Sequence, residues 1–128
     1  MLRQLLPVTK ALSDPTRLRI LKLLEEGELC VCQIVASLRL GQSSVSQQLS
    51  ILKRAGLIED TRRGRWVYYY ICETQVNPYA EPFLSLLKDM LFKDSTIQKD
   101  RERRERVRAI PVDELCASYD RKDARRIE

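Results

Sequence analysis

Two cysteines separated by one residue are the part of this sequence with the most evident chemistry. Cys30 and Cys32 lie in the stretch "GELCVCQI", residues 27–34. Thiolates are soft ligands that select thiophilic ions. On a helix, two residues are about 200° apart around the axis, whereas side chains that share a ligand are usually three or four residues apart. The pair therefore predicts a thiol site that cannot close on one ion without distorting its helix.

The composition limits the reactions in which these thiols can take part. The chain has 128 residues, with 4 cysteines and no histidine. Without histidine there is no imidazole acid or base, no Ser-His or Cys-His catalytic pair and no His-based zinc site. No phosphate-binding loop is evident either, so we expect that the protein is not an enzyme.

The first apolar run of the sequence is short. Residues 5–8 are interrupted by Pro7, and a membrane-spanning helix needs about 20 apolar residues. We therefore expect a cytoplasmic protein without a membrane segment, in which thiols stay reduced. In that setting, four cysteines favour metal binding or redox sensing over a framework of structural disulfides.

The elements that position the cysteines follow from helix signals. Ser13 or Asp14 can cap a helix, Pro15 suits its first turn and Gly27 suits its end. Two further helices, joined by a short turn that contains Gly41, form a helix-turn-helix unit. The predicted helices up to this point span residues 2–12, 15–26, 31–38 (or from Cys30) and 43–54.

The hydrophobic period changes after the predicted helix over residues 43–54. Residues 57–61 and 66–71 are rich in β-branched and aromatic residues and predict a hairpin. A helix over residues 78–98 follows, and then a charged stretch over 99–108 that continues the helix as a solvated rod or frays. We expect a winged-helix DNA-binding and dimerisation domain over residues 1–98 and a charged C-terminal extension over 99–128.

The helix over residues 43–54 has a polar face suited to DNA. Val45, Leu49 and Leu52 lie on its apolar face. Glutamine can pair with adenine through two hydrogen bonds, and serine can bond to several bases. The opposite face carries Ser43, Ser46, Gln47, Ser50 and Arg54.

Basic residues follow this polar helix directly. Residues 53–65 hold five basic and two acidic side chains. Arg62, Arg63 and Arg65 lie at the predicted hairpin tip, where they could contact phosphates or enter a minor groove. The fold class that these elements predict is mostly α with a β-hairpin wing, a winged helix-turn-helix. Palindromic operators are bound by dimers, so we expect a homodimer, formed through residues 2–12 and 78–98.

Four motifs in this order resemble the ArsR/SmtB family of metal-responsive repressors. The motifs are "ALSDPTRLRILKLL", "ELCVCQI", "GQSSVSQQLSILKRAGLI" and "RRGRWVYY". The "ELCVC" box is similar to that of the arsenic-sensing branch. The resemblance implies a homodimeric repressor of an arsenic-resistance operon, released from double-stranded operator DNA when As(III) or Sb(III) binds. It also implies that Cys30 and Cys32 are metal ligands and that Gln42 lies on the DNA-contacting helix.

The sequence departs from this family pattern at two positions. Val35 stands where a third cysteine is usual, and Gln48 stands where many members have histidine. The third ligand is therefore open between Cys116, Cys72, an external thiol and hydroxide. A cadmium- or lead-responsive repressor is an alternative, but that branch adds cysteines in an N-terminal arm and residues 1–29 have none.

A mechanism follows from the unusual spacing of the two cysteines. To hold one ion, the first turn of their helix must unwind, and that helix positions the DNA-contacting one. Ion binding and DNA binding then compete through a coupling free energy, typically about 1–3 kcal/mol. A helix N-terminus also lowers thiol pKa. The other open alternative is a redox or persulfide switch in which Cys30 or Cys32 pairs with a distant cysteine.

Overall fold

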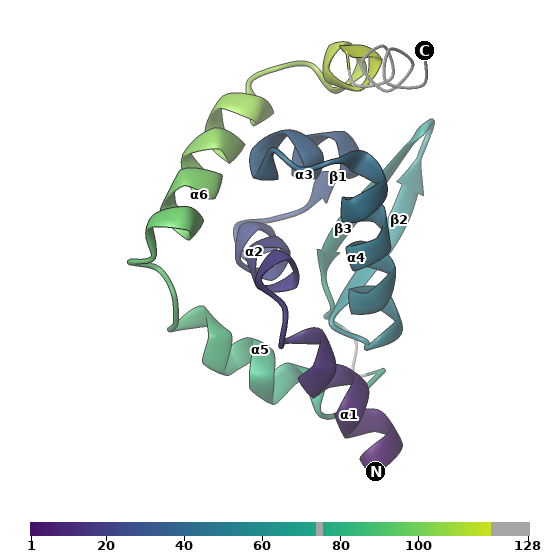
Figure 1. The fold of residues 1–128 in the computed structure, drawn as a ribbon. Coiled ribbons are helices and arrows are strands. Elements are labelled where there is room, and N and C mark those ends of the chain that lie inside the picture. Colours follow the sequence, from purple (N-terminus) through teal and green to yellow (C-terminus); the bar gives the residue numbers. More distant parts are fainter. Residues whose placement is uncertain (74–75, 119–128) are drawn as a thin grey trace.

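Helices make up most of the computed structural model, which describes residues 1–73 and 76–118 (Figure 1). The first four are α1 (Leu2–Ala11), α2 (Pro15–Leu24), α3 (Val31–Leu38) and α4 (Gln42–Arg54). Two more, α5 (Ala80–Lys88) and α6 (Ser95–Arg108), come after the sheet. Residues 112–118 are also helical.

A small antiparallel sheet lies between α4 and α5 in the chain and includes one earlier strand. Its strands are β1 (Leu29–Cys30), β2 (Ile58–Arg63) and β3 (Trp66–Ile71), in the order β1-β3-β2. The β2–β3 hairpin is the predicted wing, and the mostly helical winged fold is confirmed. The short strand β1 was not predicted, and it places Cys30 opposite Tyr68 of β3.

Local sequence explains how α2 and α3 begin and end. The Asp14 carboxylate accepts a hydrogen bond from the backbone N–H of Arg17 at 3.0 Å, with Pro15 as the first helical residue. The helix α3 ends at Arg39, whose φ of 56° turns the chain toward α4. The predicted helix-turn-helix is therefore formed by α3 and α4, with residues 39–41 as the turn.

The apolar face predicted for α4 forms part of the core. Val45, Leu49 and Leu52 are each 0% exposed. They join Ile20 and Leu21 of α2 in one hydrophobic cluster. Burial of this face fixes the rotation of α4, so its opposite face must point to solvent.

The single helix predicted over residues 78–98 is wrong, because the structure has two helices there. The chain leaves helical geometry between α5 and α6, where Leu91 has a φ of 66°. The break lets α6 turn back and pack against α2 and α3. The boundary predicted between residues 98 and 99 falls inside α6, and residues 119–128 of the predicted extension lie outside the described residues.

The charged stretch over residues 99–108 is not a solvated rod. Ile97, Asp100, Arg104 and Val107 of α6 are all buried. They recur every three or four residues, which places them on one face of the helix. The charged side chains of Asp100 and Arg104 are therefore buried together with apolar ones.

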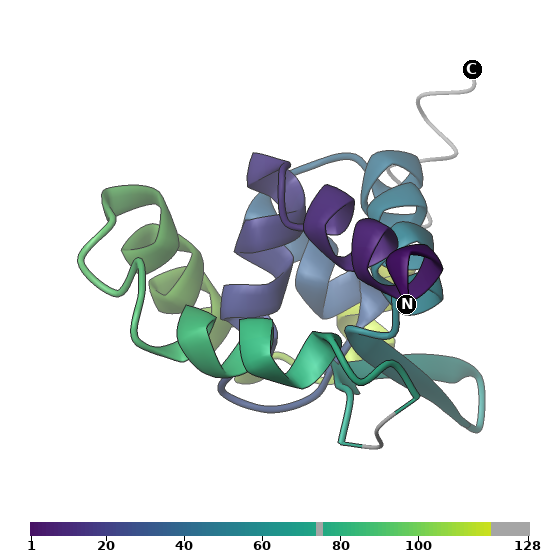
Figure 2. The ribbon, with the colours of Figure 1, turned by 90° about the horizontal axis from the view of Figure 1, so that it is seen from below.

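The helix α1 and residues 112–118 lie at opposite ends of the molecule (Figure 1). The helices α1 and α5 lie together at one end of the molecule (Figures 1 and 2), and Asn77 Nδ2 donates to the Gln4 carbonyl there at 2.8 Å. The helix α6 then leads to residues 112–118 at the other end, near the start of α3 (Figure 1). In the part of the chain that the structure describes, no helix has the length and apolarity to cross a membrane.

Candidate thiol site and DNA-binding surface

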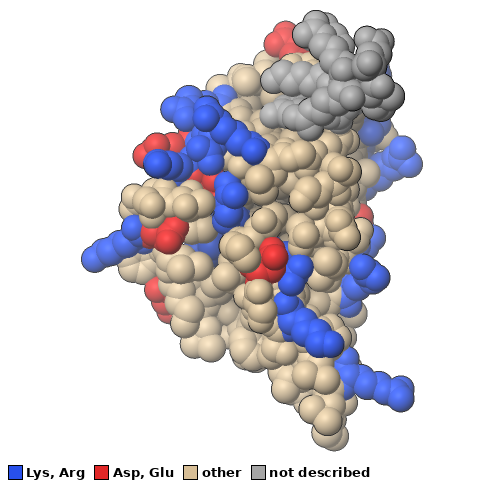
Figure 3. Space-filling model, viewed as in Figure 1, with Lys and Arg blue, Asp and Glu red and all other residues tan. Residues whose placement is uncertain are grey.

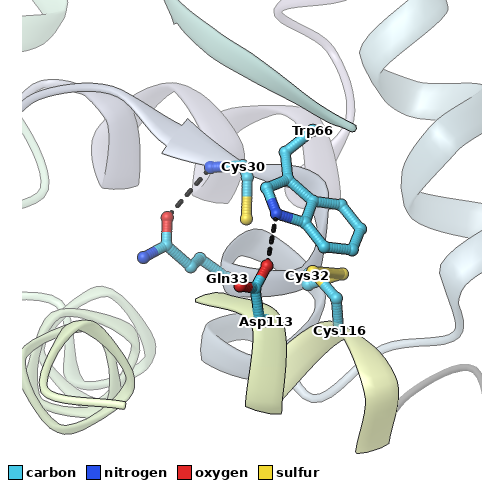
Figure 4. The surroundings of a disulfide bond; sticks show 6 residues. All are labelled: Cys30, Cys32, Gln33, Trp66, Asp113 and Cys116. Atoms are coloured by element: carbon cyan, nitrogen blue, oxygen red, sulfur yellow. Dashed lines mark hydrogen bonds between the residues drawn. A yellow bond between two sulfur atoms is a disulfide. The ribbon is translucent and has the colours of Figure 1, made fainter. Parts of the chain in front are cut away.

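Cys30 ends β1 and is the N-terminal capping residue of α3. Its backbone is extended, with φ −79° and ψ 164°, so the two cysteines do not both lie within the helix. Gln33 Oε1 accepts a hydrogen bond from the backbone N–H of Cys30 at 2.9 Å. The side chain is 1% exposed, and its sulfur points toward the side where Asp113 lies (Figure 4).

Burial decides the protonation state of Cys30. Removal from water raises the pKa of its thiol, and this outweighs the lowering by backbone N–H groups at the start of α3. The expectation that the helix N-terminus favours the thiolate is therefore wrong for this residue. Cys30 stays a thiol at neutral pH, so a ligand that needs its thiolate must displace a proton.

Cys32 lies in the first turn of α3 and is bonded to Cys116. The disulfide joins residues 84 positions apart, with their Cα atoms 5.4 Å from one another (Figure 4). Cys116 is 1% exposed and its neighbour Leu115 is 7% exposed. Of the open partners for the cysteine pair, the structure brings Cys116 to Cys32.

Cys72 is placed elsewhere. It follows the end of β3, and its sulfur donates a hydrogen bond to Glu59 Oε1 at 3.1 Å. Within the described ranges, no three His, Cys, Asp or Glu side chains converge as a preformed metal site. A site for an ion at Cys30, Cys32 and Cys116 would therefore require reduction of the disulfide and rearrangement.

The helix α6 also holds the opposite end of α3. Asp100 accepts from Arg19 Nε and Nη2, both at 2.8 Å, and from Arg103 Nη2 at 2.7 Å. The two arginines in turn donate to the last carbonyls of α3: Arg103 to Ser37 at 2.6 Å and Arg19 to Leu38 at 2.9 Å. Residues 112–118, which carry Cys116, follow α6 in the chain. The helix α6 is hydrogen-bonded to the C-terminal end of α3, and this end of α3 leads into α4.

The polar face of α4 is open to solvent. Gln48, by contrast, is half-buried and its Oε1 accepts from Arg17 at 2.8 Å. Lysine and arginine side chains lie along the edge of the molecule that carries α4 and the hairpin (Figures 1 and 3). The exposed residues of α4 include Ser43, Ser46, Gln47, Ser50 and Arg54, while Gln42 is half-buried.

The wing differs in detail from its predicted form. The strand β2 continues through Arg62 and Arg63, so the turn lies at Gly64, whose φ is 62°. Arg62 and Arg65 are exposed. Arg63 forms an ion pair with Glu28 and its guanidinium lies 4.1 Å from the ring centre of Tyr68. In this state Arg63 is bound to the protein itself.

Comparison with known proteins identifies the family. Residues 14–60 match the model of the bacterial regulatory protein arsR family. An uncharacterised HTH-type transcriptional regulator of Methanocaldococcus jannaschii is 47% identical over 70 residues, which cover 54% of this chain and 79% of the relative. The chain belongs to the arsR family. This family member is therefore a transcriptional regulator, and its relatives are not enzymes.

Two further relatives bear on the function of this arsR-family chain. The arsenical resistance operon repressor of Escherichia coli is 46% identical over 68 residues, 51% of this chain but only 58% of the repressor. A homodimeric winged helix-turn-helix DNA-binding domain from Mycobacterium bovis, a possible ArsR-family regulator, matches with a TM-score of 0.59 and 33% identity. That match covers 68% of this chain and 77% of the other.

Proposed function

We propose that this chain is a homodimeric repressor that binds operator DNA and leaves it when As(III) or Sb(III) binds its cysteines. The single observation that carries the proposal is the position of Cys116 beside Cys32 at the start of α3. Cys116, in the helical stretch 112–118, therefore supplies a second sulfur beside Cys32 of α3. The 46% identity to an arsenical resistance operon repressor supports arsenic as the signal.

The exposed face of α4 supports DNA binding by base contacts. Ser46 and Gln47 are exposed at its centre, with Arg54 at its end for a phosphate. Arg62 and Arg65 of the wing are also exposed, and basic side chains lie along the edge of the molecule that carries α4 and the hairpin (Figure 3). We propose that these residues, with Gln42, Ser43, Ser50 and Arg63, form the operator-binding surface.

Replacement of Gln47 by alanine tests the α4 contact. A glutamine that bonds to a base through both amide atoms contributes about 1–3 kcal/mol to discrimination. We expect Gln47→Ala to bind a duplex selected from a random-sequence library about 5–150-fold more weakly, measured by fluorescence anisotropy. The matched control is Gln98→Ala, an exposed glutamine on α6, for which no change is expected. Equal affinities of the two variants would refute the contact.

The chemistry at the thiol site suits a trivalent arsenic or antimony species. Two reduced thiols displace two hydroxides from As(OH)₃, forming two S–As bonds and releasing two water molecules. Soft sulfur ligands favour this exchange. We propose Cys32 and Cys116 as these two ligands, with Cys30 as the third once its buried proton is displaced and the first turn of α3 opens.

A second candidate function is a dithiol switch on the same fold. It is favoured by the disulfide between Cys32 and Cys116. Its formation from two thiols releases two protons and two electrons to an oxidant such as a peroxide or diamide. In this version the oxidised protein leaves DNA, and Cys30 takes no part.

Separate titrations discriminate between these two signals. The reduced protein on its selected duplex is titrated with sodium arsenite in one arm and with diamide in the other. Release by arsenite at near-stoichiometric concentration supports the metalloid signal, whether or not diamide also releases the protein. Release by diamide alone supports the dithiol switch. Retention of DNA in both arms would contradict the proposed function.

Exposed apolar residues on α1, on α5 and just after α5 support a homodimer. Leu2 and Leu6 are 70% and 47% exposed, and Leu86, Met90 and Phe92 are 50–57% exposed. Leu2 and Leu6 lie on α1, Leu86 lies on α5, and Met90 and Phe92 follow α5. The ribbons of α1 and α5 lie at the same end of the molecule (Figures 1 and 2). Burial of such residues against a second copy removes apolar surface from water. The Mycobacterium bovis neighbour is described as homodimeric, which supports a homodimer here.

A charge placed on this surface tests the dimer. We expect the wild type to sediment at twice the 15.0 kDa chain mass, and Leu86→Glu to shift most of the protein to monomer at micromolar concentration. Ile110→Glu, at an exposed apolar residue beyond α6, is the control and should remain dimeric. A Leu86→Glu variant that sediments like the wild type would exclude this face.

A further inference from the structure

The segment that carries Cys116 also contacts the wing. Trp66 Nε1 donates a hydrogen bond to Asp113 Oδ1 at 2.9 Å (Figure 4). Asp113 and Cys116 are three residues apart in the helical stretch 112–118, a spacing that places two side chains on one helix face. One short segment therefore touches the thiol site and the hairpin at the same time.

Trp66 is well placed to pass a displacement to the wing. It is the first residue of β3 and the register partner of Arg63, the last residue of β2. Only Gly64 and Arg65 separate these two positions at the turn. A displacement of the Trp66 indole would therefore move the residues next to the turn, which include Arg63 and Arg65.

Burial shows what holds Asp113 in place. Asp113 itself is exposed, whereas its neighbours Leu115 and Cys116 are 7% and 1% exposed. Leu115 and Cys116 are therefore the buried residues of this segment, and Cys116 is joined covalently to Cys32. When the bond opens, the position of the Asp113 carboxylate is no longer fixed by it.

We propose that Asp113 is the residue through which the state of the Cys32–Cys116 pair controls the wing. This inference rests on the proposed function, and it deepens it by naming a positioning residue. In the bridged state, Asp113 holds Trp66, and the adjoining Arg63 is paired with Glu28 rather than with a phosphate. In the unbridged state, Asp113 releases Trp66 and the wing can take its DNA-binding position.

The size of the effect follows from the kind of contact. A single hydrogen bond contributes about 0.5–1.5 kcal/mol net. Removing the Asp113 acceptor should therefore reduce the ratio of operator dissociation constants, bridged over reduced, by about 2–10-fold. The affinity of the reduced form should stay within about twofold of wild type, because the contact is absent in that state.

The test measures this ratio for a set of matched variants. Asp113→Ala removes the acceptor, Trp66→Phe removes the donor, and the double variant removes both. We expect all three to show the same reduced ratio, because each lacks the same hydrogen bond. Asp113→Asn retains an acceptor oxygen and should restore the wild-type ratio. Glu114→Ala, an exposed acidic neighbour, should leave it unchanged.

The outcomes separate this inference from the proposed function. Bridging is produced with diamide, or with arsenite in a second arm, and intact mass spectrometry verifies that each variant carries the bridge. A wild type whose affinity does not respond to bridging refutes the thiol function itself. A responsive wild type with an unchanged ratio in Asp113→Ala refutes only the role of Asp113. Equal weakening of both states in that variant would do the same, since it indicates a purely structural contact.

Discussion

Replacement of Asp100 by alanine should cost about 3 kcal/mol of the free energy of unfolding. Asp100 is 1% exposed, and its carboxylate is the shared acceptor of Arg19 and Arg103. Removing one partner of a buried ion pair typically costs 3–5 kcal/mol, since it leaves uncompensated charge. The arginine side chains are 18% and 16% exposed, so water can hydrate them in part, which favours the lower end of that range.

Urea denaturation of the whole chain measures this loss. The control is Glu102→Ala, an exposed acidic residue on the same helix, for which a change of less than about 0.5 kcal/mol is expected. A loss below about 1 kcal/mol in Asp100→Ala would show that α6 is held by other contacts. The Asp100 carboxylate and its two arginines would then not be the main contacts that hold α6 against the end of α3.

Replacement of Cys32 by serine should abolish the response of DNA binding to the signal. An allosteric coupling of about 1–3 kcal/mol corresponds to a 5–150-fold loss of operator affinity in the wild type. Cys32→Ser removes the sulfur that joins α3 to Cys116, so its affinity should be the same with and without the signal. Anisotropy titrations with the selected duplex, with and without arsenite, measure both values.

Cys30→Ser gives the matched comparison in the same box. As a third arsenic ligand, Cys30 should be needed for full response to arsenite but not for disulfide formation between Cys32 and Cys116. We therefore expect a weakened arsenite response and an unchanged diamide response in this variant. An unchanged arsenite response would remove Cys30 from the site and leave the other two cysteines as the ligands.

Most of the fold could be predicted from the sequence, because helix caps, apolar spacing and turn residues depend only on residues close together in the chain. The apolar spacing of Val45, Leu49 and Leu52 correctly gave the buried face of α4. The break after α5 was missed, since apolar residues continue through Leu91 without a Pro or Gly to stop the helix. The strand β1 was also missed because two residues form no pattern of their own and pair only with β3.

The candidate site shows the same limit. The sequence pointed to Cys30 and Cys32, but the partner of Cys32 lies 84 residues away and depends on how α6 packs. The buried charges on α6 could have indicated that packing. Asp100 and Arg104 recur with Ile97 and Val107 at helical spacing, a pattern that the dense surrounding charge obscured. The contact between Trp66 and Asp113 has no signal in the sequence.

We propose that bridging Cys32 to Cys116 controls operator binding. The most direct measurement is the operator dissociation constant of Cys116→Ser against wild type, each reduced and then treated with arsenite or diamide. We predict that the reduced forms bind the selected duplex equally well and that only the wild type weakens, about 5–150-fold, on treatment. A Cys116→Ser variant that weakens as much as the wild type with both reagents would contradict the account.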